Sequence, residues 1–145
     1  MTNPGTLVVN PDAASADSRF VAPELVALDA KGAPHLIGGR CAKCSAVSFP
    51  RAAVCTECLS EEVAETELAH EGKLYSFSVV HQAPRGWTVP YALGYVDLSD
   101  DVRVLAHIDA PAEQLSIDMP LRLSVGAVGI DTAGAPLLSY TFTPV

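Results

Sequence analysis

The fold of this chain is decided by two short cysteine motifs, Cys41-Ala42-Lys43-Cys44 and, after ten intervening residues, Cys55-Thr56-Glu57-Cys58. In a Cys-x-x-Cys motif both sulfur atoms lie on one tight turn, and two such turns facing each other can complete a tetrahedron around one zinc ion. Because cysteine fills all four ligand positions, none remains for a catalytic water. The motifs therefore predict a structural zinc site, with the segment 47–51 between them forming the short strands of a ribbon.

Two other uses of these cysteines are a redox dithiol and disulfide pairs. A thioredoxin-like site needs a βαβ setting and one Cys-x-x-Cys, and the sequence meets neither condition. The four cysteines are bunched within eighteen positions, and the start of the chain lacks the basic and apolar pattern of an export signal. We therefore expect thiolate–metal chemistry and a cytoplasmic location.

Composition sets limits on the fold and on the partners. The chain has 145 residues, the size of one ordinary domain or two very small ones, and 49% of them are hydrophobic. No stretch approaches the roughly 20 apolar residues of a membrane span, so we expect no membrane partner. A net charge of −8 argues against nucleic acid, because neutralising phosphates needs a basic face. Residues 1–19, which are mostly small or polar, are predicted to form a flexible tail.

The segment 20–70 is predicted to hold the ribbon and a short N-terminal element. Apolar residues at three-to-four spacing in 20–28 fit about two helical turns beginning near Pro23, although an extended segment fits equally well. Turn-forming residues over 29–34 predict a hairpin that leads into the cysteines. Gly38 and Gly39 are expected to loosen this approach.

From Gly72 onward the hydrophobic pattern changes to period two, which is typical of strands. Five strands are predicted, and the linker 111–118 between the third and fourth has room for a helical turn. This number fits the five-stranded OB-fold barrel better than a seven-stranded sandwich. We therefore predict a mainly β protein with an OB-fold over 71–145. The predicted strands cover 73–80, 91–98, 102–109, 121–125 and 137–143.

Basic residues are concentrated in two stretches, 31–56 and 73–96, that contain no Asp or Glu. Two interpretations are open. The cations can partly neutralise a four-thiolate zinc site, which carries a formal charge of −2. Alternatively, they form a small basic surface for a phosphorylated small molecule. The candidate ligand-binding residues are Arg40, Lys43, Arg51, Lys73 and Arg85.

The sequence offers no convincing catalytic group. It contains no Gly-rich phosphate loop, no His-x-x-x-His and no Gly-x-Ser-x-Gly nucleophile turn. His81 stands where an acid or base could act, but a histidine at a strand end is usually just exposed or hydrogen-bonded. We expect His35, His70 and His107 at the surface. Trp87, in the proline-bounded loop 81–90, is either a core residue or an anchor for a partner.

Several segments resemble the acyl-CoA-associated zinc-ribbon/OB-fold family, long known only as a domain of unknown function. The resemblance spans roughly 25–142 and departs from the family at Thr56, where proline often follows the cysteine. It implies a rubredoxin-like ribbon beside an OB-fold, in complexes that degrade lipids or aromatic compounds, with the catalytic residues mostly on the partner. The matching segments are Leu36–Cys44, Phe49-Pro50-Arg51, Cys55–Cys58, Gly72–Val80 and Pro90-Tyr91.

Three functions are therefore compared. The first is a non-catalytic accessory subunit of an acyl-CoA-processing hetero-oligomer, bound to a thiolase-like or lipid-transfer-type aldolase partner and contacting part of the CoA. In an alternative form of this function, the partner is a MaoC-like enoyl-CoA hydratase. The second is a nucleic-acid-binding module, since both folds serve that purpose elsewhere. The third is a free-standing enzyme, for which no nucleophile or open metal site can be named. The resemblance and the acidic charge favour the first.

Overall fold

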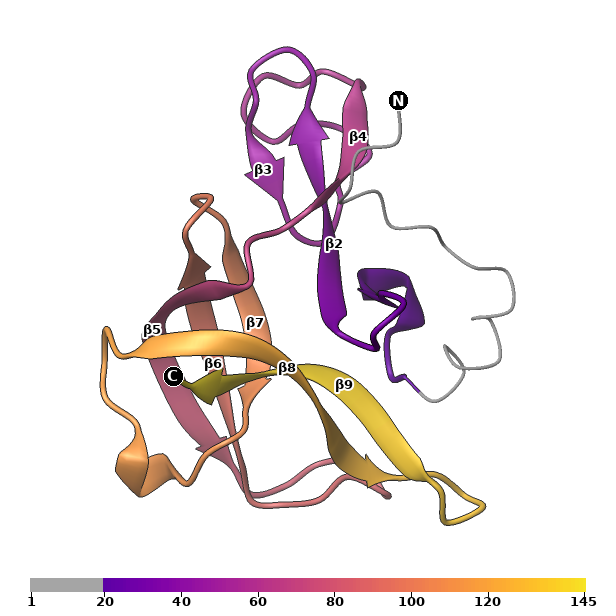
Figure 1. Cartoon of the computed structure of the whole chain (residues 1–145), viewed down its shortest axis with the longest axis vertical. Helices are drawn as coiled ribbons and strands as arrows, with labels where there is room; N and C mark the ends of the chain where they lie inside the picture. The colour runs from indigo at the N-terminus through magenta and orange to yellow at the C-terminus, as the bar shows by residue number, and fades with distance from the viewer. Residues whose placement is uncertain (1–19) are drawn as a thin grey trace.

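A computed structural model describes residues 20–145, and the predicted tail over 1–19 lies outside this range. Two β structures follow each other along the chain (Figure 1). A small sheet of strands β1–β4 carries the two cysteine loops at one end of the molecule, and strands β5–β9 close into a barrel.

The small sheet is built around its longest strand, β2. It consists of β1 (Val26–Leu28), β2 (Pro34–Cys41), β3 (Val47–Ser48) and β4 (Val63–Glu67), and β2 pairs antiparallel with the other three. The hairpin predicted over 29–34 is confirmed, because β1 and β2 pair across this turn. Strand β4 was not predicted. It has only one buried apolar residue, Val63, and its place comes from pairing with β2.

The N-terminal segment combines both predicted conformations. A single 3-10 turn, η2 (Pro23–Leu25), has proline in its first position, where the missing N–H is not needed. The chain then becomes extended, because β1 finds a hydrogen-bonding partner in β2. Two full helical turns do not form.

Gly38 and Gly39 tighten the sheet, so the expectation that they loosen the chain is wrong. Both are buried in the middle of β2. A Cβ atom at position 38 would lie 2.6 Å from the backbone oxygen of Ser48, and one at position 39 would lie 2.7 Å from a methyl group of Val63. Glycine is required because the neighbouring strand and side chains approach β2 so closely.

The barrel confirms the predicted OB-fold, with five strands in the closed order β5-β6-β7-β9-β8. Every pairing is antiparallel except that of β7 with β9. The predicted helical turn is present as η3 (Ala112–Gln114), between β7 and β8. Strand β8 extends well beyond the predicted segment, because its second half pairs with β9. The bounds are β5 Glu71–Val80, β6 Tyr91–Leu98, β7 Arg103–Ile108, β8 Pro120–Ile130 and β9 Pro136–Pro144.

One hydrophobic core joins the barrel to the lower part of the ribbon sheet. The barrel side chains Phe142, Leu74 and Leu121 are fully buried, and Leu36 of β2 belongs to the same cluster. Phe49, just after β3, packs edge-to-face on Tyr140 of β9 with ring centroids 5.7 Å apart. The base of the ribbon is therefore held by the barrel. Residues 20–145 contain no helix of the length and apolar character that a membrane crossing needs.

Candidate functional site

The two cysteine motifs form loops with the same backbone geometry. In the first loop the N–H of Ser45 donates to the carbonyl of Cys41, and in the second the N–H of Leu59 donates to the carbonyl of Cys55, both at 3.0 Å. Ser45 and Leu59 each have a positive φ, of 66° and 64°. A left-handed residue directly after the second cysteine turns the chain back, so each loop presents both sulfur atoms on one side.

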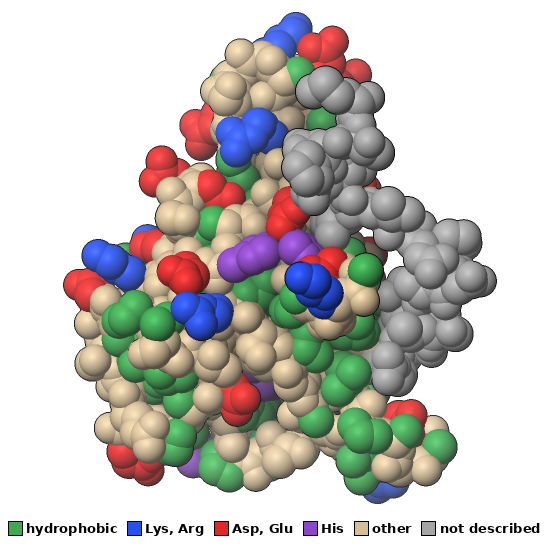
Figure 2. Space-filling model, in the orientation of Figure 1, with side chains coloured by type: hydrophobic (Ala, Val, Ile, Leu, Met, Phe, Trp, Pro, Cys, Tyr) green, Lys and Arg blue, Asp and Glu red, His purple; other side chains and the backbone are tan. Residues whose placement is uncertain are grey.

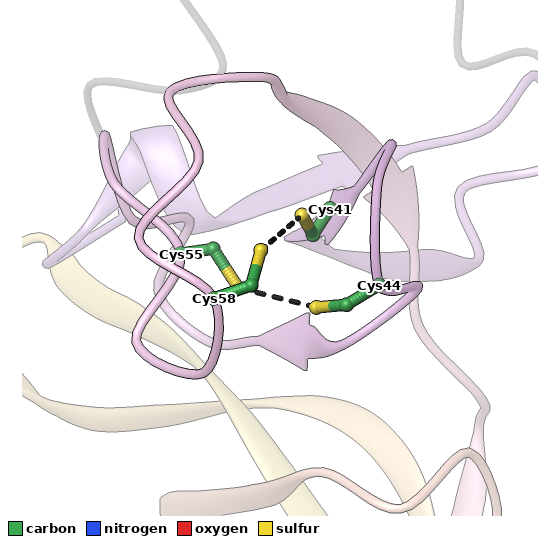
Figure 3. A group of neighbouring side chains, drawn as sticks. All are labelled: Cys41, Cys44, Cys55 and Cys58. Atoms are coloured by element: carbon green, nitrogen blue, oxygen red, sulfur yellow. Dashed lines mark hydrogen bonds between the residues drawn. The ribbon is translucent and has the colours of Figure 1, made fainter.

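The four sulfur atoms converge between these loops (Figure 3). Cys41 Sγ lies 3.5 Å from Cys58 Sγ, and Cys44 Sγ lies 3.5 Å from Cys55 Sγ. All four lie within 4.8 Å of one another. A tetrahedral zinc ion with Zn–S bonds of about 2.3 Å would place its sulfur ligands about 3.8 Å apart. The four cysteines are therefore positioned to bind a metal ion, and this geometry supports a structural zinc.

Backbone N–H groups prepare the inner sulfur of each loop for metal binding. The N–H groups of Cys44 and Lys43 point at Cys41 Sγ and lower the pKa of this thiol to about 6. The N–H of Ala46 favours the thiolate of Cys44, but hydrogen bonding with Cys55 raises the pKa of Cys44 to about 12. The N–H of Ser60 favours the thiolate of Cys58, but the hydrogen bond with Cys41 raises the pKa of Cys58 as well. Metal binding favours the thiolate form of every ligand, so it releases the protons that the thiols of Cys44 and Cys58 still carry.

Three of the predicted cationic residues lie on the ribbon. Arg40 donates from Nη1 to the carbonyl of Ser45, and Lys43 is exposed between the first two cysteines. Arg51 donates from Nε and Nη2 to the carbonyl of Val63, at 3.0 and 2.8 Å, so it ties the segment that follows β3 to β4. Arg40 and Arg51 thus have structural contacts as well as charge.

The other two predicted cations lie on the barrel, far from each other. Lys73 is near the start of β5, whereas Arg85 follows the end of this strand, in the loop 81–90. Because a strand rises about 3.3 Å per residue, one phosphate group cannot contact both. Among residues 20–145, the ion pairs of Lys and Arg involve Arg51, Arg103 and Arg122. The structure therefore does not bring the five cations into one cluster.

Trp87 packs against the barrel. Its ring stacks on Tyr91 and on His107, with centroids 6.2 and 5.5 Å apart. The loop is fastened to β8 by hydrogen bonds from Thr88 N–H to the Val128 carbonyl and from Ile130 N–H to the Gly86 carbonyl. The tryptophan is half-buried, so it has some features of both predicted alternatives.

The histidine side chains differ in exposure, and two of them are more buried than predicted. His70 and His81 are exposed, but His107 is half-buried between Trp87 and Tyr91, and its Nε2 has no hydrogen-bonding partner. This burial lowers the pKa of His107. His35 is also wrongly predicted as a surface residue, since its side chain is only 14% exposed and bonds to two carboxylates. The sequence held no signal for these contacts, because the partners are distant along the chain.

Comparisons with known proteins agree with this architecture. A family model described as the rubredoxin-like zinc ribbon domain of ChsH2 matches residues 28–64, and a second, described as the C-terminal OB-fold domain of ChsH2, matches residues 65–126. The benzoylsuccinyl-CoA thiolase subunit BbsA of Thauera aromatica is 37% identical over 130 residues, which cover 89% of this chain and 90% of BbsA.

Two further proteins are similar to this chain. A DUF35 domain-containing scaffold protein of Methanocaldococcus jannaschii is 32% identical over 115 residues, covering 76% of this chain and 82% of that protein. A chain of the solved Ltp2-ChsH2(DUF35) aldolase is 27% identical and superposes with a TM-score of 0.62, covering 76% of this chain and 84% of that one. The chain therefore belongs to the ChsH2 (DUF35) family, whose members join a rubredoxin-like zinc ribbon to a C-terminal OB-fold.

Proposed function

We propose that this chain is a non-catalytic accessory subunit of an acyl-CoA-processing complex, with a thiolase-like or lipid-transfer-type protein as its partner. The observation that carries this proposal is the 37% identity to a benzoylsuccinyl-CoA thiolase subunit across nearly the full length of both chains. The likeness to a chain of the Ltp2-ChsH2 aldolase supports the same class of role. The metal site with four thiolate ligands leaves no position for a substrate, so this site is structural, and we assign the catalytic groups to the partner.

Exposed apolar side chains support a subunit role. Tyr75, Tyr95 and Leu105 are 43–49% exposed on the outer side of β5, β6 and β7, where Tyr95 and Leu105 are direct cross-strand neighbours. At the tip of the ribbon, Leu59 is 76% exposed in the second cysteine loop. Aromatic and large apolar residues of this kind are enriched at the centres of protein interfaces. A partner that covers these side chains in a complex would remove their apolar surface from water.

We further propose that the subunit contributes cations to CoA. Lys43, Lys73 and Arg85 are the best candidates, because their side chains are exposed and form none of the ion pairs of residues 20–145. Arg40 and Arg51 can contribute charge, but their guanidinium groups also bond to backbone carbonyls. Since these cations are spread along the molecule, we expect only part of them to contact the phosphates.

The test of the accessory role is purification of the tagged chain from its native host, followed by identification of whatever co-purifies. We expect a thiolase-like or lipid-transfer-type polypeptide in stoichiometric amount, and acyl-CoA turnover that requires both proteins. Co-purifying nucleic acid, or turnover by the isolated chain, would contradict the proposal.

CoA contact is tested separately, by calorimetric titration of the assembled complex with CoA. Replacing Lys43, Lys73 or Arg85 with alanine should weaken binding by about 1–3 kcal/mol wherever the residue meets a phosphate. Arg122→Ala is the matched control, because this exposed arginine is paired with Glu71 on the barrel. If all three variants bind CoA like the control, the cations do not contact the ligand.

A further inference from the structure

A second group of metal-ligating side chains lies at the junction between the ribbon sheet and the barrel. It consists of His35 on β2, Glu67 at the end of β4, and His70 in the connection to β5. His70 Nε2 lies 3.2 Å from His35 Nδ1 and 2.9 Å from Glu67 Oε1, and His35 Nδ1 is in direct contact with this same oxygen. Figure 2 shows histidine side chains gathered at the surface below the ribbon.

We propose that these three residues bind a divalent transition-metal ion of the zinc class, through His35 Nδ1, His70 Nε2 and Glu67 Oε1. A zinc ion with bonds of about 2.0–2.2 Å in tetrahedral geometry holds its nitrogen and oxygen ligands about 3.3 Å apart. Two of the three separations, 3.2 and 2.9 Å, are near this value, and the third pair, His35 Nδ1 and Glu67 Oε1, is in direct contact. Two imidazoles and one carboxylate are ligands that such ions commonly take, and they leave one position for a water.

The hydrogen bond between His35 and Asp29 leaves a lone pair on Nδ1, the nitrogen that faces Glu67 and His70. Asp29 Oδ2 lies 3.1 Å from His35 Nε2, so this nitrogen carries the proton that it donates to the carboxylate. The other oxygen of Asp29 accepts from the N–H groups of Lys31 and Ala33, at 2.8 and 2.9 Å, which holds the carboxylate in place. A carboxylate that orients a histidine through its second nitrogen is the usual partner of a metal-binding imidazole.

With Nε2 protonated, Nδ1 of His35 presents a lone pair to the lone pairs of Glu67. Two acceptors in contact need a cation between them, which is either a proton or a metal ion. Without metal, the cluster needs two protons, one between His35 Nδ1 and Glu67 and a second one on His70 Nε2, whereas a single metal ion is bound by all three ligand atoms. The convergence of His70 Nε2 on the same point therefore favours a metal ion.

Backbone hydrogen bonds of the strands and of the connection to β5 hold the ligands, so the site is preorganised. His35 and Glu67 lie on the same face of the sheet, because Glu67 is the direct partner of Ile37, two residues after His35. The carbonyl of His70 accepts a hydrogen bond from the N–H of Leu123 on β8, at 2.8 Å. The ion would thus bridge β2 and β4 to the chain entering the barrel.

The fourth coordination position faces water. The His70 side chain is 43% exposed, and a shallow groove lined by Glu67 and His70 continues past Glu71 and Asp100. A water molecule, or an anionic oxygen from a ligand, can therefore reach the ion. The site differs in this respect from the four-cysteine site, which cysteine fills completely.

The test is a calorimetric titration with Zn²⁺ of full-length protein that already carries one zinc per chain. We expect one further equivalent to bind in the wild type. His70→Ala and Glu67→Gln should each weaken this second site at least tenfold, and Asp29→Asn, which removes only the orienting carboxylate, by about tenfold. His81→Ala is the matched control, since His81 is an exposed histidine outside the cluster, and it should keep the second equivalent.

Cobalt identifies the ligands independently of affinity. Co²⁺ added to the same protein should produce visible ligand-field bands without the thiolate-to-cobalt charge-transfer absorption of a cysteine site, and Glu67→Gln, which keeps the side-chain size, should abolish them. The proposal is overturned if the wild type binds no second equivalent, which would leave a proton joining His35 and Glu67. It is also overturned if His70→Ala and Glu67→Gln bind the second ion as the wild type does.

Discussion

Replacing Cys44 with serine should release the metal ion and unfold the two cysteine loops while the barrel stays folded. Cys44 is exposed, and its sulfur lies 3.5 Å from Cys55 Sγ. A serine oxygen is a much poorer zinc ligand than a thiolate, so the tetrahedral site loses one of four ligands. The change is nearly isosteric, which separates loss of the metal from loss of packing.

The size of the expected stability loss in the two cysteine loops follows from how few buried side chains hold them. The ribbon's own buried cluster contains only Cys41, Cys55 and Val63, with Ala46 packed against it. Burying a side chain such as Val63 contributes about 1.5–3 kcal/mol. A structural zinc ion contributes about 10–16 kcal/mol of apparent binding free energy at neutral pH, which is also folding free energy. The metal therefore supplies most of the free energy that orders the loops, and they cannot stay ordered without it.

The barrel does not depend on this site in the same way. Its core is centred on Phe142, Leu74 and Leu121 and shares no residue with the ribbon cluster. Hydrogen exchange followed by mass spectrometry, together with zinc analysis, measures both parts in one sample. We expect fast exchange over 41–62 in Cys44→Ser, and retained protection in β5 and β6.

The matched control is Ala42→Ser, which introduces the same hydroxyl group at an exposed position of the same loop without changing a ligand. It should keep one zinc per chain and wild-type exchange. If Cys44→Ser lacks zinc yet keeps slow exchange over 55–60, the metal does not hold the ribbon. If β5 and β6 also lose protection, the ribbon and the barrel unfold together and the local assignment is wrong.

Three further changes test the packing and the charges of the barrel, each by denaturant unfolding of the isolated chain. Trp87→Ala should lower the free energy of unfolding by about 1–3 kcal/mol, because Trp87 is half-buried in its aromatic stack. A fully buried tryptophan would lose roughly 3–5 kcal/mol. Unchanged stability would instead indicate an anchor that acts only in a complex. Gly129→Ala should lower the free energy of unfolding by about 1–3 kcal/mol, since a Cβ there would collide with the backbone oxygen of Gly86, and an unfolding midpoint equal to that of the wild type would refute this close approach. Arg103 donates to Asp97 at 2.6 and 3.0 Å and lowers the pKa of that carboxyl below its ordinary value. The stabilisation from this ion pair is therefore present above the pKa of Asp97 in the unfolded chain, and it is lost as the pH falls through the pKa of Asp97 in the folded protein. Both side chains are over 40% exposed, so water screens the pair. Asp97→Asn should therefore lower the free energy of unfolding by less than about 1 kcal/mol at neutral pH and reduce the loss of stability on acidification. If the acid dependence of stability is unchanged, the assignment is refuted.

The parts of the fold that were predicted correctly all have a local cause. Strand β6 was predicted with its observed bounds, because an apolar run lies between the proline-bounded loop 81–90 and the turn residues 99–101. The hairpin before the cysteines followed from the turn chemistry of Asp29 and Gly32, whose contacts span only a few residues. Strand β4 was missed because Glu65, Thr66 and Glu67 carry no apolar pattern, and pairing with β2 alone makes them a strand.

The sequence by itself determined the candidate metal centre, since two Cys-x-x-Cys motifs each present their sulfur atoms within a single turn. It also determined the barrel, because the period-two pattern reports which side of each strand is buried. Only the tertiary structure decided that Gly38 and Gly39 tighten the sheet and that His107 is partly buried. It alone brought His35 together with His70, 35 residues away. Such contacts join residues that are far apart along the chain, so they leave no periodic or local signal and exist only once the strands have paired.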